Sequence, residues 1–316
     1  MFIKRELLLG IARSSGSLLL FLALLFLGAT MPARAQVGLG LLPMRVELKM
    51  APGQQYSGSL KLSSQSGAKM RIRSEIDDFF VDDHASPQFE RELPREAAYS
   101  CKKWLSLNPM EIELENGGFL NVRYTLRLPP DVAEGSYNCA AGFTTMPPAG
   151  QAAAGIGMQM AVRIVAALYV EVGAPPVVGR LKEIKLEPPP PPAPGPQGSP
   201  APQDATQDSS GPQGSQQGAG STGGWQAVLV MENSGKMYYR PTGKLEVLDE
   251  AGKTVETADI PSLPVLRERD QRFLFPLKTK LEPGHYKLRA RVDIGTGEIQ
   301  QGSADVSVEA EAKGQN

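Results

Sequence analysis

The sequence predicts an all-β protein made of two β-sandwiches in tandem, and three observations support this prediction. Apolar and polar residues alternate over many short segments, which is typical of half-buried strands. Turns rich in Gly and Pro separate these segments, and no stretch shows convincing helical periodicity. About 280 residues remain once an N-terminal targeting segment is set aside, which exceeds one typical domain. Two domains are therefore expected.

The N-terminal segment has the pattern of an export signal. Basic residues precede an apolar run that ends at Leu27, and Ala33-Arg34-Ala35 forms an A-x-A cleavage site before Gln36. We therefore predict that residues 1–35 are a cleaved signal peptide and that the mature protein lies in the periplasm or at the cell surface. No later segment is apolar over the length that a membrane helix requires, so we expect no transmembrane segment in the mature protein.

The charge balance argues against a nucleic-acid partner. The chain has 33 Lys and Arg residues against 34 Asp and Glu residues, and residues 1–35 hold four of the basic and one of the acidic groups, so the mature net charge is −4. A nucleic-acid-binding domain is usually basic.

Residues 36–174 are expected to form the first sandwich, with about seven strands. In "MRVELKM" the apolar residues Met44 and Val46 alternate with charged ones, so they should face the core while Arg45 points away. The same period of two recurs in three later segments, which are "SGSLKLS", "KMRIRSEI" and "FLNVRYTLRL". The segments "CKKWLSLN" and "GSYNCAAGF" complete the expected set of strands, which is typical of a β-sandwich.

The two cysteines, Cys101 and Cys139, are expected to form a disulfide. Cys139 shares a strand face with apolar neighbours, and Cys101 shares one with Leu105 and Leu107, so both thiols should point inward. An exported protein meets an oxidising compartment, which favours a bridge between the two sheets. Two buried, unpaired thiols are the alternative. Two Cys without nearby His do not make a zinc site.

The stretch "MQMAVRIVAALYVEV", Met158 to Val172, is predicted to be one unusually long strand. Every second residue from Met158 is apolar, whereas Gln159, Arg163 and Glu171 fall in the opposite phase. Such a strand either lends an exposed edge to a partner by β-augmentation or runs as a long core strand into the second domain.

Residues 175–312 are expected to form the second sandwich. It contains a Pro- and Gly-rich tract, 188–224, that lacks the apolar residues needed to fold and is predicted to be disordered. The tract is either an interdomain linker or a long loop between the first two strands of this domain, "GRLKEIKLE" and "WQAVLVMEN".

An internal repeat indicates that both sandwiches are immunoglobulin-like. "GSYNCAA" and "GHYKLRA" share the pattern G-x-Y-x-φ-x-A, with Tyr137 and Tyr286 at equivalent places near the start of a late strand. A Tyr two residues before an inward-facing position is similar to the tyrosine corner of immunoglobulin-like sandwiches. The fold class expected is therefore two tandem immunoglobulin-like β-sandwiches after a cleaved signal peptide.

No pattern of catalytic, cofactor-binding or metal-binding residues stands out. The acidic cluster from Asp77 to His84 matches no ligand loop and fits a solvated loop better, although a bound cation is left open. His285 lies far in sequence from any nucleophile of a triad, and the glycines of "AGIGMQ" do not form a phosphate-binding loop. We therefore expect a non-enzyme.

The opening "MRVEL" strand, the segment "WLSLNPMEIELENGGFLNVRYTLRLPPD" and the long alternating strand before a second sandwich resemble the periplasmic pilus-assembly chaperones. The resemblance implies that the long strand completes an incomplete secreted or pilus-type subunit, while basic residues hold the subunit's terminal carboxylate. Carried over to this chain, it implies a peptide-binding set of six residues, which are Arg45, Arg163, Met158, Met160, Val162 and Ile164.

Two features depart from those chaperones. The first is that Ala166 and Ala167 stand where the second basic residue is expected, so that the nearest candidate is Arg163, three residues earlier. The second is the tract 188–224, which those chaperones normally lack. The segment "ENSGKMYYRPTGKLEVLDEAGK", with its N-S-G turn followed by a strand, also resembles the second domain of cell-surface proteins built from two comparable sandwiches. The alternative is therefore a non-catalytic cell-envelope module that binds a surface protein or a cell-wall component.

Overall fold

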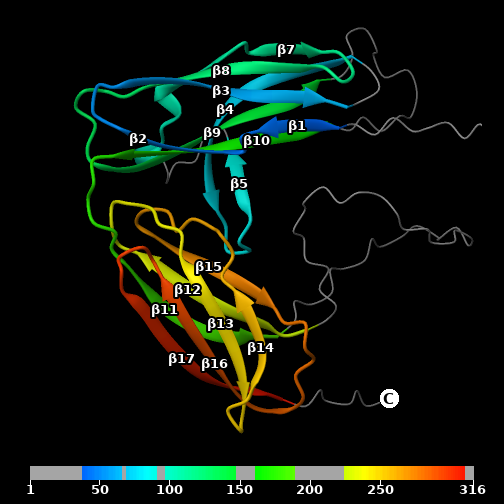
Figure 1. Cartoon of the computed structure of the whole chain (residues 1–316), viewed down its shortest axis with the longest axis vertical. Coiled ribbons are helices and arrows are strands. Elements are labelled where there is room, and N and C mark those ends of the chain that lie inside the picture. Colours follow the sequence, from blue (N-terminus) through cyan, green and yellow to red (C-terminus); the bar gives the residue numbers. More distant parts are fainter. Residues whose placement is uncertain (1–37, 66–68, 91–96, 147–160, 189–223, 310–316) are drawn as a thin grey trace, which may run out of the picture.

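The computed structural model describes residues 38–65, 69–90, 97–146, 161–188 and 224–309, and it consists of two β-sandwiches (Figure 1). Strands β1 to β10 form the first sandwich and β11 to β17 the second. The prediction of an all-β chain with two tandem immunoglobulin-like sandwiches is confirmed. The expected signal peptide and the tract from 189 to 223 lie outside the described residues.

The first sandwich packs two sheets face to face. One sheet has the order β1-β3-β8-β6, made of β1 (Leu39–Leu42), β3 (Gln55–Ser64), β8 (Phe119–Arg127) and β6 (Leu105–Asn108). The other has the order β2-β10-β9-β4-β5, made of β2 (Arg45–Met50), β10 (Arg163–Val172), β9 (Gly135–Met146), β4 (Met70–Val81) and β5 (Pro87–Glu90), with β7 (Glu111–Leu114) also paired to β4. Two short 3-10 turns, η1 (Ala97–Tyr99) and η2 (Lys102–Trp104), precede β6.

The chain changes sheets between β1 and β2. β1 pairs with β3 in one sheet, whereas β2 pairs in parallel with β10 in the other, with Arg45 opposite Ala167. Val46 is buried as expected, but the prediction that Met44 faces the core is wrong, because its side chain is 54% exposed. Met44 lies in the crossing between the sheets, where strand alternation does not apply.

The predicted disulfide joins Cys101 to Cys139, with the Cα atoms 5.2 Å apart, and this prediction is confirmed. Both residues are fully buried in the core of the first sandwich, together with Leu105 and Leu107. Both cysteine side chains therefore face the core, as the alternation in the sequence predicted.

The second sandwich also has two sheets. The first has the order β11-β12-β15, made of β11 (Gly179–Glu187), β12 (Gln226–Asn233) and β15 (Arg269–Pro276). The second has the order β14-β13-β16-β17, made of β14 (Thr254–Asp259), β13 (Thr242–Asp249), β16 (Gly284–Asp293) and β17 (Ile299–Val308). β11 and β12 pair antiparallel up to Glu187 and Gln226, so the residues on either side of the tract 188–224 are strand partners.

Both sandwiches contain the hydrogen bond of a tyrosine corner. The Tyr137 hydroxyl donates to the Ala133 carbonyl at 2.9 Å, and the Tyr286 hydroxyl donates to the Glu282 carbonyl at 3.0 Å. Each tyrosine lies two residues into its strand, β9 or β16, and reaches four residues back. The similarity inferred from the sequence repeat is confirmed.

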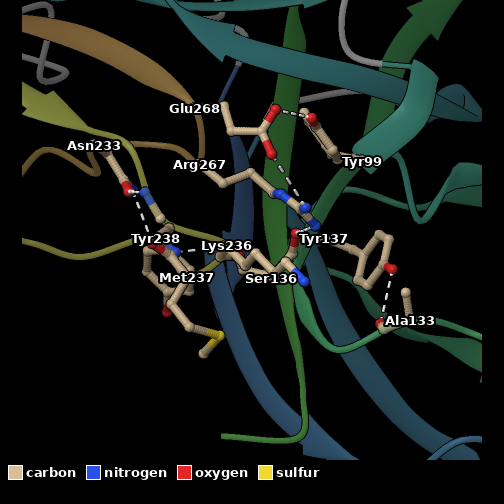
Figure 2. Close-up of polar contacts among 11 residues, drawn as sticks. Tyr99, Ala133, Ser136, Tyr137, Asn233, Lys236, Met237, Tyr238, Arg267 and Glu268 are labelled. Atoms are coloured by element: carbon tan, nitrogen blue, oxygen red, sulfur yellow. Dashed lines mark hydrogen bonds and ion pairs between the residues drawn. The ribbon is translucent and has the colours of Figure 1, made fainter. Parts of the chain in front are cut away.

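A turn of the second sandwich is hydrogen-bonded to the first (Figure 2). Asn233 accepts a bond from the Gly235 amide at 2.9 Å and donates to the Met237 carbonyl at 2.8 Å, which orders the turn after β12. Ser136 at the start of β9 then bonds this turn, because its amide donates to the Lys236 carbonyl at 2.9 Å and its hydroxyl accepts from the Tyr238 amide at 2.8 Å. The turn is thereby fixed against the first sandwich.

Arg267 adds a second junction between the sandwiches. Its guanidinium lies 3.9 Å from the centroid of the Tyr99 ring and bonds the Ser136 carbonyl at 3.5 Å, and the hydroxyl of Tyr99 bonds Glu268 (Figure 2). The hairpin of β4 and β5 extends toward the second sandwich (Figure 1). Gln271 of β15 donates to the carbonyl of Asp82, just after β4, at 3.4 Å. These contacts set the geometry of the cleft between the two sandwiches.

Candidate functional site

A cleft of about 590 Å³ opens between the two sandwiches, beside the first half of β10. Its walls are largely apolar and come from both domains. Residues that line it include Met44, Phe79, Phe89, Val165, Tyr169 and Leu263. Three arginines, Arg45, Arg163 and Arg240, also line the cleft. An apolar groove with a few convergent charges is typical of a binding site.

The first half of β10 has one edge that no described strand covers. On one side β10 pairs with β9 along its whole length, but on the other side β2 begins only at Arg45, opposite Ala167. The carbonyl of Val162, an even-numbered residue, accepts from the Thr145 amide of β9, whereas the amide of Ala167, an odd-numbered residue, donates to the Met44 carbonyl on the other side. Because the direction alternates along a strand, the odd-numbered residues of β10 direct their backbone groups away from β9. The amide and carbonyl groups of Arg163 and Val165 therefore face the cleft side.

β10 is shorter than the sequence predicted. It begins at Arg163, and Val162, although described, lies outside the strand. Ile164 is half-buried against the core of the first sandwich, in the phase that the alternation indicated. Met158 and Met160 lie outside the described residues.

Arg163 is held by a buried carboxylate within its own sheet. Its guanidinium forms an ion pair with Asp77 of β4, on the far side of β9, and the Asp77 side chain is only 1% exposed. The arginine can lie across β9 because Gly142 has no side chain, and a Cβ there would come within 2.9 Å of the Asp77 carboxylate. Arg163 is thus already engaged with an internal partner.

Arg45 and Arg240 both contact Glu47. The Nε atom of Arg45 and the Nε atom of Arg240 each lie 3.4 Å from the same oxygen, Oε1 of Glu47. Arg45 and Glu47 are exposed on the outer face of β2, whereas Arg240 comes from the segment between β12 and β13. Two domains therefore place two guanidinium groups around one carboxylate.

An aromatic cluster forms the floor beneath these charges. The rings of Tyr169 and Tyr238, from different sandwiches, have centroids 4.8 Å apart, and Phe79 meets Tyr169 edge-on at 5.3 Å. The Arg240 guanidinium lies 4.8 Å from the centroid of the Tyr169 ring, within cation-π range. Burial raises the pKa of Tyr169 above the ordinary value of 10.0, while Arg240 acts in the opposite direction.

The acidic cluster is only partly the solvated loop that the sequence suggested. Asp77 and Asp78 are buried on β4, where Asp77 pairs with Arg163 and Asp78 accepts a bond from the Ser100 hydroxyl. Asp82 caps the turn after β4 by accepting bonds from the amides of His84 and Ser86, both at 2.9 Å. Among the described residues, no group of three or more acidic, His or Cys side chains could hold a metal ion.

The structure brings His285 next to a serine that is distant in sequence. Its Nδ1 atom lies 3.0 Å from the Ser307 hydroxyl on the exposed faces of β16 and β17. In the part of the chain that the structure describes, no hydrogen bond joins His285 to a carboxylate.

Sequence reasoning missed the contribution of the second sandwich to the cleft. Tyr238 and Arg240 follow the N-S-G turn in "NSGKMYYRP", and the adjacent aromatic and basic residues after a turn were the available signal. Their importance depends on the contact of that turn with Ser136, a residue 102 positions earlier than Tyr238.

The fold and the cleft define a protein of two sandwiches with a largely apolar groove between them. No family model matches the sequence, and no curated protein matches it. Among solved structures, the chain is similar to the class 5 fimbriae chaperone CfaA, with a TM-score of 0.40 and 9% identity over 87% of this chain and 100% of that one.

Two further chaperones are similar to the chain. The YadV chaperone has a TM-score of 0.39 and 12% identity, over 85% of this chain and 99% of that one. The E. coli chaperone DraB has a TM-score of 0.37 and 14% identity, over 86% and 98%. Within the described residues, no helix has the length and apolar character to cross a membrane.

Proposed function

We propose that the chain binds an extended segment of a secreted or pilus-type protein subunit, which adds as a strand to the open edge of β10 in the cleft. The observation that carries this proposal is the uncovered edge at Arg163 and Val165 beside an apolar groove. Strand addition supplies backbone hydrogen bonds, and alternate side chains of the added segment supply apolar contacts. A chaperone acting in the periplasm is the role that fits this binding mode.

The direction of the added strand follows from the position of β2. A segment parallel to β10 ends where β2 begins, at Met44 and Arg45, so that its terminal carboxylate meets the Arg45 guanidinium. An antiparallel segment would bring an ammonium group to the same place. The cation therefore favours the parallel direction, because charge-assisted hydrogen bonds to a carboxylate are strong.

A proline at position 165 tests the strand addition. The Val165 amide points away from β9, so Val165→Pro removes a donor to the partner while leaving the β9 ladder intact, and proline is tolerated on strand edges. Val165→Ala is the matched control, since it shortens the side chain and keeps the amide. We expect the tagged protein to capture a subunit from the envelope fraction, with capture retained in Val165→Ala and lost in Val165→Pro.

Hydrogen exchange of the captured complex gives the second readout. We expect the amides of Arg163 and Val165 to become protected on binding, and Arg45→Ala to weaken capture without unfolding the protein, because the Arg45 side chain is 53% exposed. Unchanged exchange at both amides would contradict strand addition. Capture of a cell-wall glycan or a large surface protein with these amides unprotected would support the envelope-module alternative.

A further inference from the structure

Glu47 lies between two arginines of the cleft. Arg45 and Arg240 both lie 3.4 Å from Glu47 Oε1, and Glu47 faces Tyr169 across the β2 and β10 pair. Its side chain is 43% exposed, so the carboxylate can turn toward water without being buried elsewhere. Two cations and one anion leave a net positive charge at this point of the cleft.

Arg240 is positioned by contacts other than Glu47. Its Nη1 atom donates to the Ser262 carbonyl at 3.0 Å, its guanidinium stacks over Tyr169, and its side chain is only 17% exposed. A guanidinium held in this way loses little conformational freedom when it binds a carboxylate. Arg240 is therefore a preorganised anion contact supplied by the second sandwich.

Arg163, in contrast, is unsuited to this role. Releasing it would leave Asp77 as a buried carboxylate without its ion-pair partner, and Asp77 Oδ1 already has no hydrogen-bond partner among the described residues. An uncompensated buried charge is strongly destabilising. The second cation that the sequence pointed to at Arg163 is better supplied by Arg240.

We infer that Arg45 and Arg240 form the carboxylate-binding pair of the cleft, and that Glu47 occupies this pair until the terminal carboxylate of a bound strand takes its place. The inference rests on the proposed function and extends it, because it makes the free protein self-inhibited by one internal carboxylate. Exchange of one carboxylate for another conserves the charge between the two arginines, and Glu47 becomes hydrated.

The test uses a fluorescent peptide of alternating valine and threonine with a free C-terminal carboxylate, and the same peptide as its C-terminal amide. Binding of both is measured by fluorescence anisotropy. We expect Glu47→Gln to bind the acid peptide about fivefold more tightly and the amide unchanged, since one exposed ion pair is worth up to about 1 kcal/mol. We expect Arg240→Gln to reduce the preference for the acid, because Arg45 alone remains, and Arg240→Lys to reduce it less.

Two single variants, Glu246→Gln and Arg289→Gln, serve as controls. Each removes one partner of an ion pair on the second sandwich, in which Arg289 Nε lies 2.8 Å from Glu246 Oε2, and neither residue lines the cleft. Neither control should change the ratio of acid to amide affinity. Equal affinity for the two peptides in every variant would overturn the carboxylate-binding pair but would leave strand addition standing. Absence of binding of either peptide, to the wild type and to Glu47→Gln, would reject strand addition as well. Circular dichroism of each variant confirms that it is folded.

Discussion

Arg163 and Asp77 form an ion pair across the backbone of Gly142, although 86 positions separate them in the sequence. The pair joins the open edge of β10 to β4 through the strand between them. The Arg163 side chain is 35% exposed, whereas the Asp77 side chain is only 1% exposed. Removing Arg163 therefore leaves a buried charge without a partner, which costs more than leaving the partly exposed arginine alone.

Arg163→Met is expected to destabilise the first sandwich by roughly 3 kcal/mol, near the lower end for breaking a buried pair, because Arg163 is partly exposed. The measurement is urea unfolding followed by Trp104 fluorescence in a Trp225→Phe background. Arg71→Met is a matched control, since Arg71 is also 35% exposed but its ion pairs within the described residues are with exposed glutamates at 4.0 Å. A loss as small as that of the control would show that Asp77 does not depend on Arg163.

Reduction of the Cys101–Cys139 bridge is expected to cost about 4 kcal/mol in the chain-entropy model, because the bridge closes a loop with a sequence separation of 38. Unfolding of the same Trp104 reporter, with and without dithiothreitol, measures the difference. Thiol titration of the unfolded, unreduced protein provides the control. Two titratable thiols in that sample would contradict the bridge.

Replacing residues 188–224 with a short Gly-Asn turn is expected to leave the melting temperature unchanged or slightly raised. β11 and β12 are paired up to Glu187 and Gln226, and a shorter connection lowers the entropy cost of closing the hairpin. Differential scanning calorimetry compares the two proteins. A fall of more than about 5 °C would mean that the tract contributes to the stability of the fold.

Stability is expected to fall at alkaline pH through Tyr238, which packs against Tyr169 of the cleft. Burial raises the pKa of Tyr238, and the carboxylates of Glu47 and Glu171 raise it further above the ordinary 10.0. As the pH rises, Tyr238 therefore loses its proton at a lower pH in the unfolded chain than in the folded protein. Its contribution to the free energy of unfolding is fully present below pH 10.0 and is lost as the pH rises toward the higher pKa of the folded protein.

Tyr238→Phe should make this alkaline fall less steep, and urea unfolding across the alkaline range measures it. Tyr286→Phe is the control, because it removes a tyrosine hydroxyl of the second sandwich that bonds a backbone carbonyl outside the cleft lining. Identical pH profiles for the wild type and Tyr238→Phe would contradict the assignment.

The sequence predicted much of the first sandwich because strand alternation and burial have the same period. Cys101, Cys139, Tyr137 and Tyr286 all take the places that their phase and repeat indicated. Met44 was misassigned because the chain leaves one sheet for the other just before β2, and alternation has no meaning in that crossing. Arg45 and Arg163 both line the cleft, where Arg163 forms an ion pair with Asp77, and the peptide-binding set read from the sequence stays a prediction.

By itself the sequence determined the strand pattern, the inward cysteines and the exposed Arg45, because each depends on neighbours one or two residues away. Only the tertiary structure decided which cations meet at the cleft. Arg240 reaches Glu47 over 193 positions, through a turn fixed to Ser136 and an aromatic stack between two domains. Such a juxtaposition depends on how two separate sandwiches pack against each other, and no local period in the sequence encodes that packing.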